Sequence, residues 1–144
     1  MCCPKWLKIV LIAVGLLFVV IQFVPVDRTN PPITGEIQAP DNIMHILRKA
    51  CYDCHSNETV WPWYSYIAPM SWTIESDVKV GRGDLNFSEW SDYSPMKQDF
   101  KQAQSGELVA AGEMPLWFYI PIHPEADLSK EEIELIVAWG KEAE

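Results

Sequence analysis

Mostly apolar residues form one long uncharged run near the N-terminus of the 144-residue chain. Residues 9–26 contain no charged side chain, and Gln22 is their one clearly polar residue. As a helix, a segment of this length spans roughly 27 Å, which is close to the thickness of the hydrocarbon core of a bilayer. The run therefore predicts one N-terminal transmembrane helix within residues 1–26.

The segment after this run has a different pattern. Residues 27–42 contain three prolines and a glycine and show no apolar periodicity. Such a composition is typical of an extended linker. We therefore expect three parts: a membrane anchor over residues 1–26, a linker over residues 27–42 and a folded domain over residues 43–144.

Within the expected domain, apolar residues recur at helical spacing in four places, and no strand pattern is found. The helices are expected over residues 43–55, 70–80 and 95–111 and after the Ser129–Glu132 capping box. Ser94 and Pro95 are a typical N-cap and first helical residue, whereas Gly81 is expected to end the second helix. The sequence predicts a mostly helical domain of about four helices with long loops.

Charge divides the chain into two regions. The formal net charge is −9, yet residues 1–28 carry three basic side chains and one acidic one. Lys5 and Lys8 precede the apolar run, so the positive-inside rule places the acidic domain on the periplasmic or outer side of a bacterial cytoplasmic membrane. No small-x-small cleavage site follows the run, which favours an uncleaved single-pass anchor that contacts the membrane through residues 9–26. The acidic balance excludes nucleic acid as a default partner.

Residues 51–55 read CYDCH, which is a C-x-x-C-H motif. Cys51 and Cys54 lie one helical turn apart, so both thiols can add to vinyl groups on one edge of a porphyrin while His55 reaches the iron. The spacing predicts one covalently bound haem c with His55 as the proximal ligand. A redox dithiol, a structural disulfide and a zinc site are the alternatives, but neither a βαβ pattern nor an obvious set of further zinc ligands accompanies the motif.

Three residues are candidates for the sixth ligand of the iron. Met114 is the first choice, because it lies in a loop directly after a predicted helix and far along the chain from His55. Met70 is the runner-up, and His123, which has a proline on each side nearby, is third. A Met thioether raises the reduction potential, whereas a second imidazole lowers it. With both axial positions filled by protein side chains, one-electron transfer is the expected chemistry.

The chain contains seven tryptophans, a large number of flat apolar side chains for its length. A porphyrin needs flat apolar walls, so we expect Trp63 and Trp117 to contact the haem, with core packing as the alternative. Arg82, between two glycines, is either a partner for a haem propionate or a solvated charge.

Several motifs together resemble a known family. They are residues 51–59 (CYDCHSNET), 62–65 (PWYS), 85–90 (LNFSEW), 112–115 (GEMP) and the closing helix with Trp139. The combination is similar to the bacterial membrane-anchored haem-binding domain family, a branch of the monohaem cytochrome c-like proteins. The resemblance implies an all-α cytochrome c-like fold, covalent haem on Cys51 and Cys54, His55 as the proximal ligand and Met114 as the distal ligand.

These observations lead to one hypothesis and two alternatives. We expect a membrane-anchored periplasmic monohaem c-type cytochrome that transfers single electrons and is an electron carrier rather than an enzyme. Its acidic surface favours redox partner proteins with basic docking patches. The alternatives are a peroxidase-like enzyme subunit and a haem sensor with an open distal site.

Overall fold

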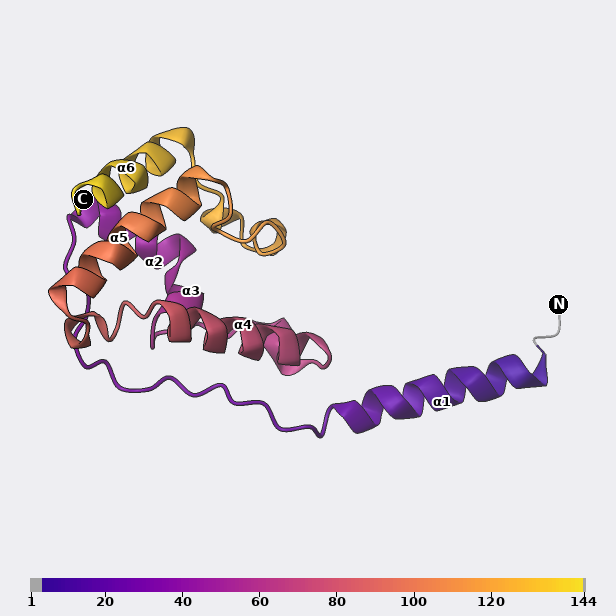
Figure 1. The fold of residues 1–144 in the computed structure, drawn as a ribbon. Helices are drawn as coiled ribbons and strands as arrows, with labels where there is room; N and C mark the ends of the chain where they lie inside the picture. The colour runs from indigo at the N-terminus through magenta and orange to yellow at the C-terminus, as the bar shows by residue number, and fades with distance from the viewer. Residues whose placement is uncertain (1–3, 144) are drawn as a thin grey trace. The chain divides into compact units, whose positions relative to one another are not determined.

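The computed structural model describes residues 4–143 of the chain, and all of its named elements are helices (Figure 1). The α-helices are α1 (Lys5–Ile21), α2 (Asp41–Ala50), α3 (Tyr52–His55), α4 (Met70–Asp84), α5 (Pro95–Ala110) and α6 (Lys130–Lys141). Short 3-10 helices are η1 (Trp63–Tyr66), η2 (Trp90–Asp92), η3 (Ile120–Ile122) and η4 (Pro124–Ala126). The prediction of an all-α fold is confirmed.

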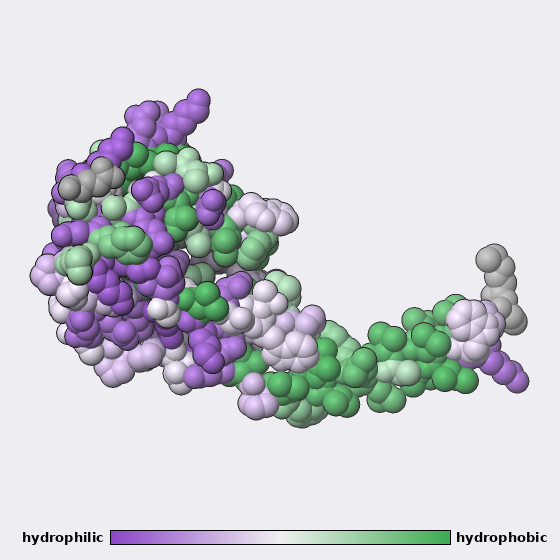
Figure 2. Space-filling model, in the orientation of Figure 1, coloured by the Kyte–Doolittle hydropathy of each residue, from purple (hydrophilic) through white to green (hydrophobic). Residues whose placement is uncertain are grey.

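The described chain divides into two compact units. The first unit contains the residues up to Thr29 together with Trp61–Asp77, and the second contains Asn30–Val60 and the residues from Val78 onward. The whole C-x-x-C-H motif belongs to the second unit. Figure 2 shows apolar side chains along α1 and a mostly polar visible face on the second unit.

The apolar N-terminal run forms α1, but this helix ends at Ile21. Among the helices that the structure describes, none is both long and apolar enough to span a membrane. The prediction of an N-terminal transmembrane helix is therefore wrong. Directly after the helix, the side-chain oxygen of Gln22 accepts a hydrogen bond from the Ala68 N–H at 2.9 Å. Pro25, shortly after, cannot continue a helix.

The location of the acidic domain and the attachment of residues 9–26 to a membrane stay predictions. Most side chains of α1 are exposed, Leu7 and Ile21 are partly exposed, and none of its residues is buried.

Two helices begin at the caps that the sequence predicts. The Ser94 side chain caps α5, and Pro95 is the first residue of that helix. Ser129 and Glu132 form a reciprocal capping box at the start of α6. Gly112 follows the end of α5 with a φ of +70°, a left-handed conformation that glycine adopts without steric cost. Local sequence chemistry therefore sets these three boundaries.

Two other boundaries differ from the predictions. The helix expected over residues 43–55 is divided into α2 and α3, because Cys51 leaves the helical conformation with a φ of −124°. The second expected helix does not end at Gly81 but continues as α4 to Asp84. Gly81 serves close packing rather than termination, since a Cβ there would lie 2.6 Å from the carbonyl oxygen of Cys54.

Helices α5 and α6 lie side by side and form the main helix pair of the second unit (Figure 1). Gly106 on α5 faces Gly140 on α6, and a Cβ on Gly140 would lie 3.0 Å from the Gly106 Cα. The two helix backbones therefore approach each other directly. Helix α2 joins this pair through buried Ile46 and through Lys49, whose Nζ lies 2.6 Å from Glu132 Oε1 on α6.

Part of the segment expected to be a linker packs onto the second unit. The Ile37 N–H donates to the Phe87 carbonyl at 2.9 Å, and Gly35 forms a parallel bridge with Glu89. The side chains of Ile37 and Phe87 are fully buried. The Phe87 N–H donates in turn to the His55 carbonyl at 2.8 Å. This extended segment therefore supports the chain that runs beside the C-x-x-C-H motif.

Candidate haem site

An apolar pocket of the second unit is lined by two residues of the C-x-x-C-H motif, Cys51 and His55, whereas Cys54 is not among the described residues that line it. Its space, including the open mouth, is about 650 Å³. Cys51, His55 and Met114 all line this pocket, although they lie far apart in the sequence. Its apolar wall includes Ile46, Leu47, Leu85, Phe87, Leu108 and Ile136. The fold therefore brings the first-choice distal ligand and the proximal histidine to one cavity.

His55 is oriented by two backbone carbonyls. Its Nδ1 lies 3.0 Å from the Gly81 oxygen and 3.1 Å from the Leu85 oxygen. Carbonyl oxygens only accept hydrogen bonds, so Nδ1 carries the proton and Nε2 carries the lone pair. Burial lowers the pKa of His55, which keeps the ring neutral. A neutral imidazole with its lone pair on Nε2 is the form that binds a metal ion.

The last turn of α4 and the residue directly after it supply these carbonyls. The Gly81 oxygen also accepts the Leu85 N–H at 2.9 Å, and its second lone pair is available for His55. Gly81 allows the approach, because the space that a Cβ would fill is already occupied by the backbone of Cys54. The glycine that the sequence analysis interpreted as a stop signal thus positions the proximal histidine.

Cys51 and Cys54 are thiols and are not joined by a disulfide. Burial, together with the nearby Cys54, raises the pKa of the Cys51 thiol to about 12. The reactive cysteine of a redox dithiol has a lowered pKa instead, since the thiolate is the nucleophile. In the described part of the chain, no three His, Cys, Asp or Glu side chains are grouped so that they could hold a metal ion. The geometry favours neither the redox-dithiol nor the zinc alternative.

One end of the pocket is polar. Asp84 and Gln104 line this end, and the Lys101 Nζ lies 2.9 Å from Asp84 Oδ1 and 2.9 Å from Gln104 Oε1. Lys101 is buried, and a buried charge is tolerated only when it is paired and hydrogen-bonded. The negative charge of Asp84 therefore balances the positive charge of Lys101 at this end of the pocket.

A buried ring of hydrogen bonds holds the residues that follow the motif. The Asn57 N–H donates to Ser88 Oγ at 2.9 Å, and the Ser88 N–H donates to Asn86 Oδ1 at 3.0 Å. Asn86 Nδ2 closes the ring by donating to Asn57 Oδ1 at 2.9 Å. All three residues are at most 3% exposed, so water does not compete for these bonds. We call Asn57, Asn86 and Ser88 the polar ring; it joins two of the sequence motifs, CHSNET and NFSEW.

Arg82 connects the same segment to α4. Its Nε donates to the Ser56 carbonyl at 2.7 Å, and its Nη2 donates to Thr59 Oγ1 at 2.8 Å and to Asn30 Oδ1 at 2.7 Å. The guanidinium therefore supports the backbone after the motif. It is neither a solvated charge nor one of the residues that line the pocket.

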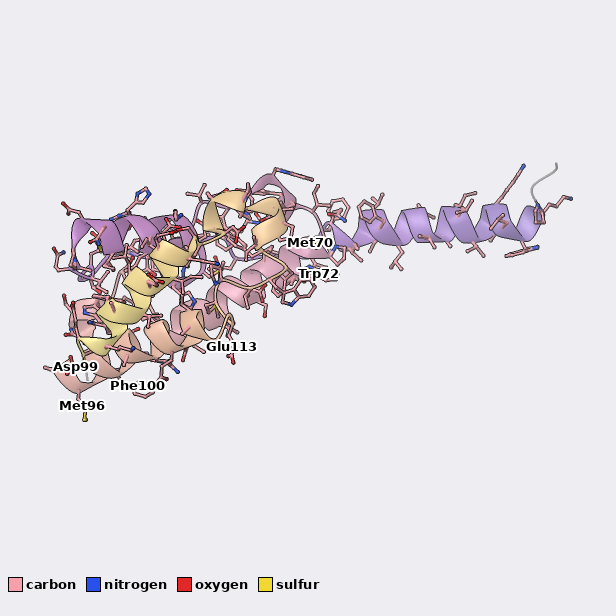
Figure 3. All side chains as sticks on the ribbon, turned by 90° about the horizontal axis from the view of Figure 1, so that it is seen from above. Met70, Trp72, Met96, Asp99, Phe100 and Glu113 are labelled. Atoms are coloured by element: carbon pink, nitrogen blue, oxygen red, sulfur yellow. The ribbon has the colours of Figure 1, made fainter. Side chains whose placement is uncertain are left out.

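The other candidate residues lie outside the pocket wall. Met70 begins α4 in the first unit (Figure 3), and Trp63 in the same unit is 75% exposed. Trp117 is 78% exposed, and the His123 Nδ1 lies 3.0 Å from Glu125 Oε1. None of these candidates is among the described residues that line the pocket. Their roles as ligands or haem contacts stay predictions.

The chemistry of the donor set suits a haem. Two thiols at the C-x-x-C spacing, an oriented neutral imidazole and a thioether accompany a pocket with an apolar wall. A haem is an apolar macrocycle whose iron binds imidazole and thioether ligands. The fold and the site together define a helical haem-binding protein.

The comparison with known families agrees with this assignment. The profile of the family described as haem-binding domain matches residues 16–142, which is most of the chain. The chain belongs to the haem-binding domain family, as the resemblance of its motifs predicted. No curated protein and no solved structure matches the chain significantly.

Sequence reasoning missed several residues that build the site. Gly81 was interpreted as a helix stop, Arg82 was given no structural partner, and the polar ring was not foreseen. One signal was present, because asparagines and serines follow His55 and flank Phe87 in segments that are otherwise apolar. Polar residues in such surroundings are buried only when they bond to one another.

Replacing Gly81 with Ala tests how the proximal histidine is positioned. The new Cβ meets the Cys54 backbone, which cannot move aside as a flexible side chain would. We expect a net loss of about 1–2 kcal/mol in the free energy of unfolding, since overpacking outweighs the helix propensity that alanine gains. We also expect a reduced haem content per chain.

Gly83→Ala is the matched control for this prediction, because nothing lies within 4 Å of its Cβ position in the same helix. Urea unfolding and the haem-to-protein absorbance ratio measure both variants. Equal stability and haem content for Gly81→Ala and Gly83→Ala would contradict the proposed role of Gly81.

Proposed function

We propose that the protein is a monohaem c-type cytochrome that transfers single electrons. A haem bound in this site supplies a one-electron iron couple. Cys51 and Cys54 hold it covalently, and His55 and Met114 are the axial ligands. The observation that carries the proposal is that Cys51, Met114 and His55, whose Nδ1 is held by two carbonyls, line one apolar pocket.

The residues around the ligands have identifiable physical roles. The Gly81 and Leu85 carbonyls fix the ring of His55 and increase its basicity as a ligand. The thioether of Met114 is a soft ligand that favours the reduced iron and raises the potential. The apolar wall excludes water, which limits the structural rearrangement that accompanies a change of charge.

The composition of the pocket supports an electron carrier over a peroxidase-like enzyme. Among the described residues that line it, His55 is the one histidine and there is no arginine. Cleavage of a peroxide bond needs a positioned general acid and base on the distal side. Met114 is the side chain that we assign to that side instead, so both axial positions are filled by the protein.

The charge of the chain supports a redox partner with a basic docking patch. Twenty acidic side chains face eleven basic ones over the whole sequence. Opposite charge on a partner raises the association rate, and salt screens this attraction over about 10 Å at 0.1 M ionic strength.

We expect the electron-transfer rate with a cationic partner to fall on the order of tenfold between low and physiological ionic strength. Stopped-flow oxidation by a small cationic metal complex measures this dependence. An anionic complex of similar size is the control, and its rate should rise with salt. A rate that is the same at all ionic strengths for the cationic complex would refute electrostatic steering.

Removal of both thiols tests covalent attachment. In Cys51→Ala, Cys54→Ala, haem can still contact His55 and the apolar wall, but no thioether can form. We expect haem to remain with the wild-type chain through a denaturing gel and to be absent from the band of the double variant. A haem stain that persists on the denatured double variant would overturn the attachment sites.

The absorption spectrum tests the axial ligands. The oxidised protein, purified from a host that attaches haem c, should be low-spin and show a sulfur-to-iron charge-transfer band. Met114→Ala should abolish this band and lower the reduction potential, because a soft ligand to the reduced iron is lost.

Met96→Ala is the control for the loss of a thioether. Met96 projects away from the first turn of α5 and is 80% exposed (Figure 3). Its replacement should leave the spectrum unchanged. A charge-transfer band that survives in Met114→Ala, or that is missing from the wild-type protein, would rule out Met114 as the ligand.

A further inference from the structure

The segment that carries Met114 is held firmly at its two ends. We call residues 112–128, which connect α5 to α6, the Met114 loop. At its start, the Met114 N–H donates to the Leu108 carbonyl at 3.3 Å, and near its end Ala126 is fully buried. Between these points, Trp117 and Ile122 are more than half exposed. The middle of the loop therefore gains little stability from apolar packing.

A long-range hydrogen bond connects this middle part to the C-x-x-C-H motif. The Tyr119 hydroxyl donates to Asp53 Oδ2 at 2.8 Å. Asp53 lies between Cys51 and Cys54 in the motif, next to the residues that hold the haem in the proposed function. The hydrogen bond therefore connects the C-x-x-C-H motif directly to the Met114 loop.

The two partners are themselves held in place. The other carboxylate oxygen of Asp53, Oδ1, accepts from the Val60 N–H at 2.9 Å, and the Asp53 carbonyl accepts from Thr59 Oγ1 at 2.7 Å. The ring of Tyr119 stacks on His123 with centroids 4.0 Å apart and an interplanar angle of 6°. A bond between two oriented groups loses less conformational entropy when it forms than one between mobile side chains.

We propose that Asp53 and Tyr119 are positioning residues for the sixth ligand: their hydrogen bond holds the Met114 loop closed against the haem-attachment segment and so keeps the Met114 sulfur on the iron. This inference rests on the proposed ligation by Met114. Neither residue touches the iron, and each acts through the loop. Loss of the bond leaves the haem attached and His55 bound, but it raises the fraction of molecules in which Met114 is displaced.

The test uses the full-length haem-loaded protein with the substitution Tyr119→Phe, which removes one hydroxyl and keeps the ring that stacks on His123. Imidazole, added as an external ligand, competes with Met114 for the ferric iron. We expect Tyr119→Phe to bind imidazole about tenfold more tightly than the wild-type protein, the effect of losing one hydrogen bond to a charged group. The sulfur-to-iron charge-transfer band should also weaken.

Two further variants isolate the bond. Tyr66→Phe removes a hydroxyl from a 60% exposed tyrosine of the first unit and should change neither readout. Asp53→Ala should resemble Tyr119→Phe, and adding Tyr119→Phe to Asp53→Ala should have no further effect on imidazole affinity. Such non-additivity in a double-mutant cycle identifies a direct interaction.

Failure of this inference and failure of the proposed function give different results. If Met114→Ala abolishes the charge-transfer band while Tyr119→Phe binds imidazole like Tyr66→Phe, the positioning role is overturned and the ligation stands. Independent, additive effects of Asp53→Ala and Tyr119→Phe would also overturn it. If the wild-type protein lacks the band and binds imidazole as tightly as Met114→Ala, both the ligation and the positioning role are wrong.

Discussion

The site depends on one hydrogen-bonded proton, the Nδ1–H of His55, which is shared by the carbonyls of Gly81, in the last turn of α4, and of Leu85, directly after the helix. These two contacts select the tautomer and fix the plane of the imidazole ring. This close contact also restricts the sequence. Gly81 must be a glycine, because a Cβ there would meet the backbone of Cys54 in the C-x-x-C-H segment. Helix α4 thus contacts the motif through a glycine, a residue that helix interiors otherwise disfavour.

The polar ring and Arg82 extend this constraint to the rest of the second unit. The ring joins the segment after His55 to the segment after α4, and Ile37 joins the latter to the extended chain before α2. These bonds are formed by the backbone, by short polar side chains and by the Arg82 guanidinium. A buried network of this kind is stable only when every member is satisfied, which makes it sensitive to single changes.

Local patterns predicted the parts of the fold and of the site that local chemistry determines. The caps of α5 and α6 were correctly predicted, because each depends on residues within one turn of a helix. The motifs together also indicated the haem-binding family correctly. The end of α1 was missed although Pro25 is a local stop signal. The continuation of α4 past Gly81 was missed because it involves a distant residue, Cys54, whose backbone lies against this glycine. A pattern along one segment carries no information about such a partner.

The high pKa of Cys51 affects how fast its thiol can oxidise before the chain binds its cofactor. Oxidation of a dithiol to a disulfide proceeds through attack by a thiolate, so the rate follows the small fraction of thiol that is ionised. At neutral pH that fraction is minute for a sulfur buried in an apolar wall. Attack by the Cys51 thiolate is thus slow in the folded chain, because the burial that makes this side chain part of the pocket wall also keeps its sulfur protonated.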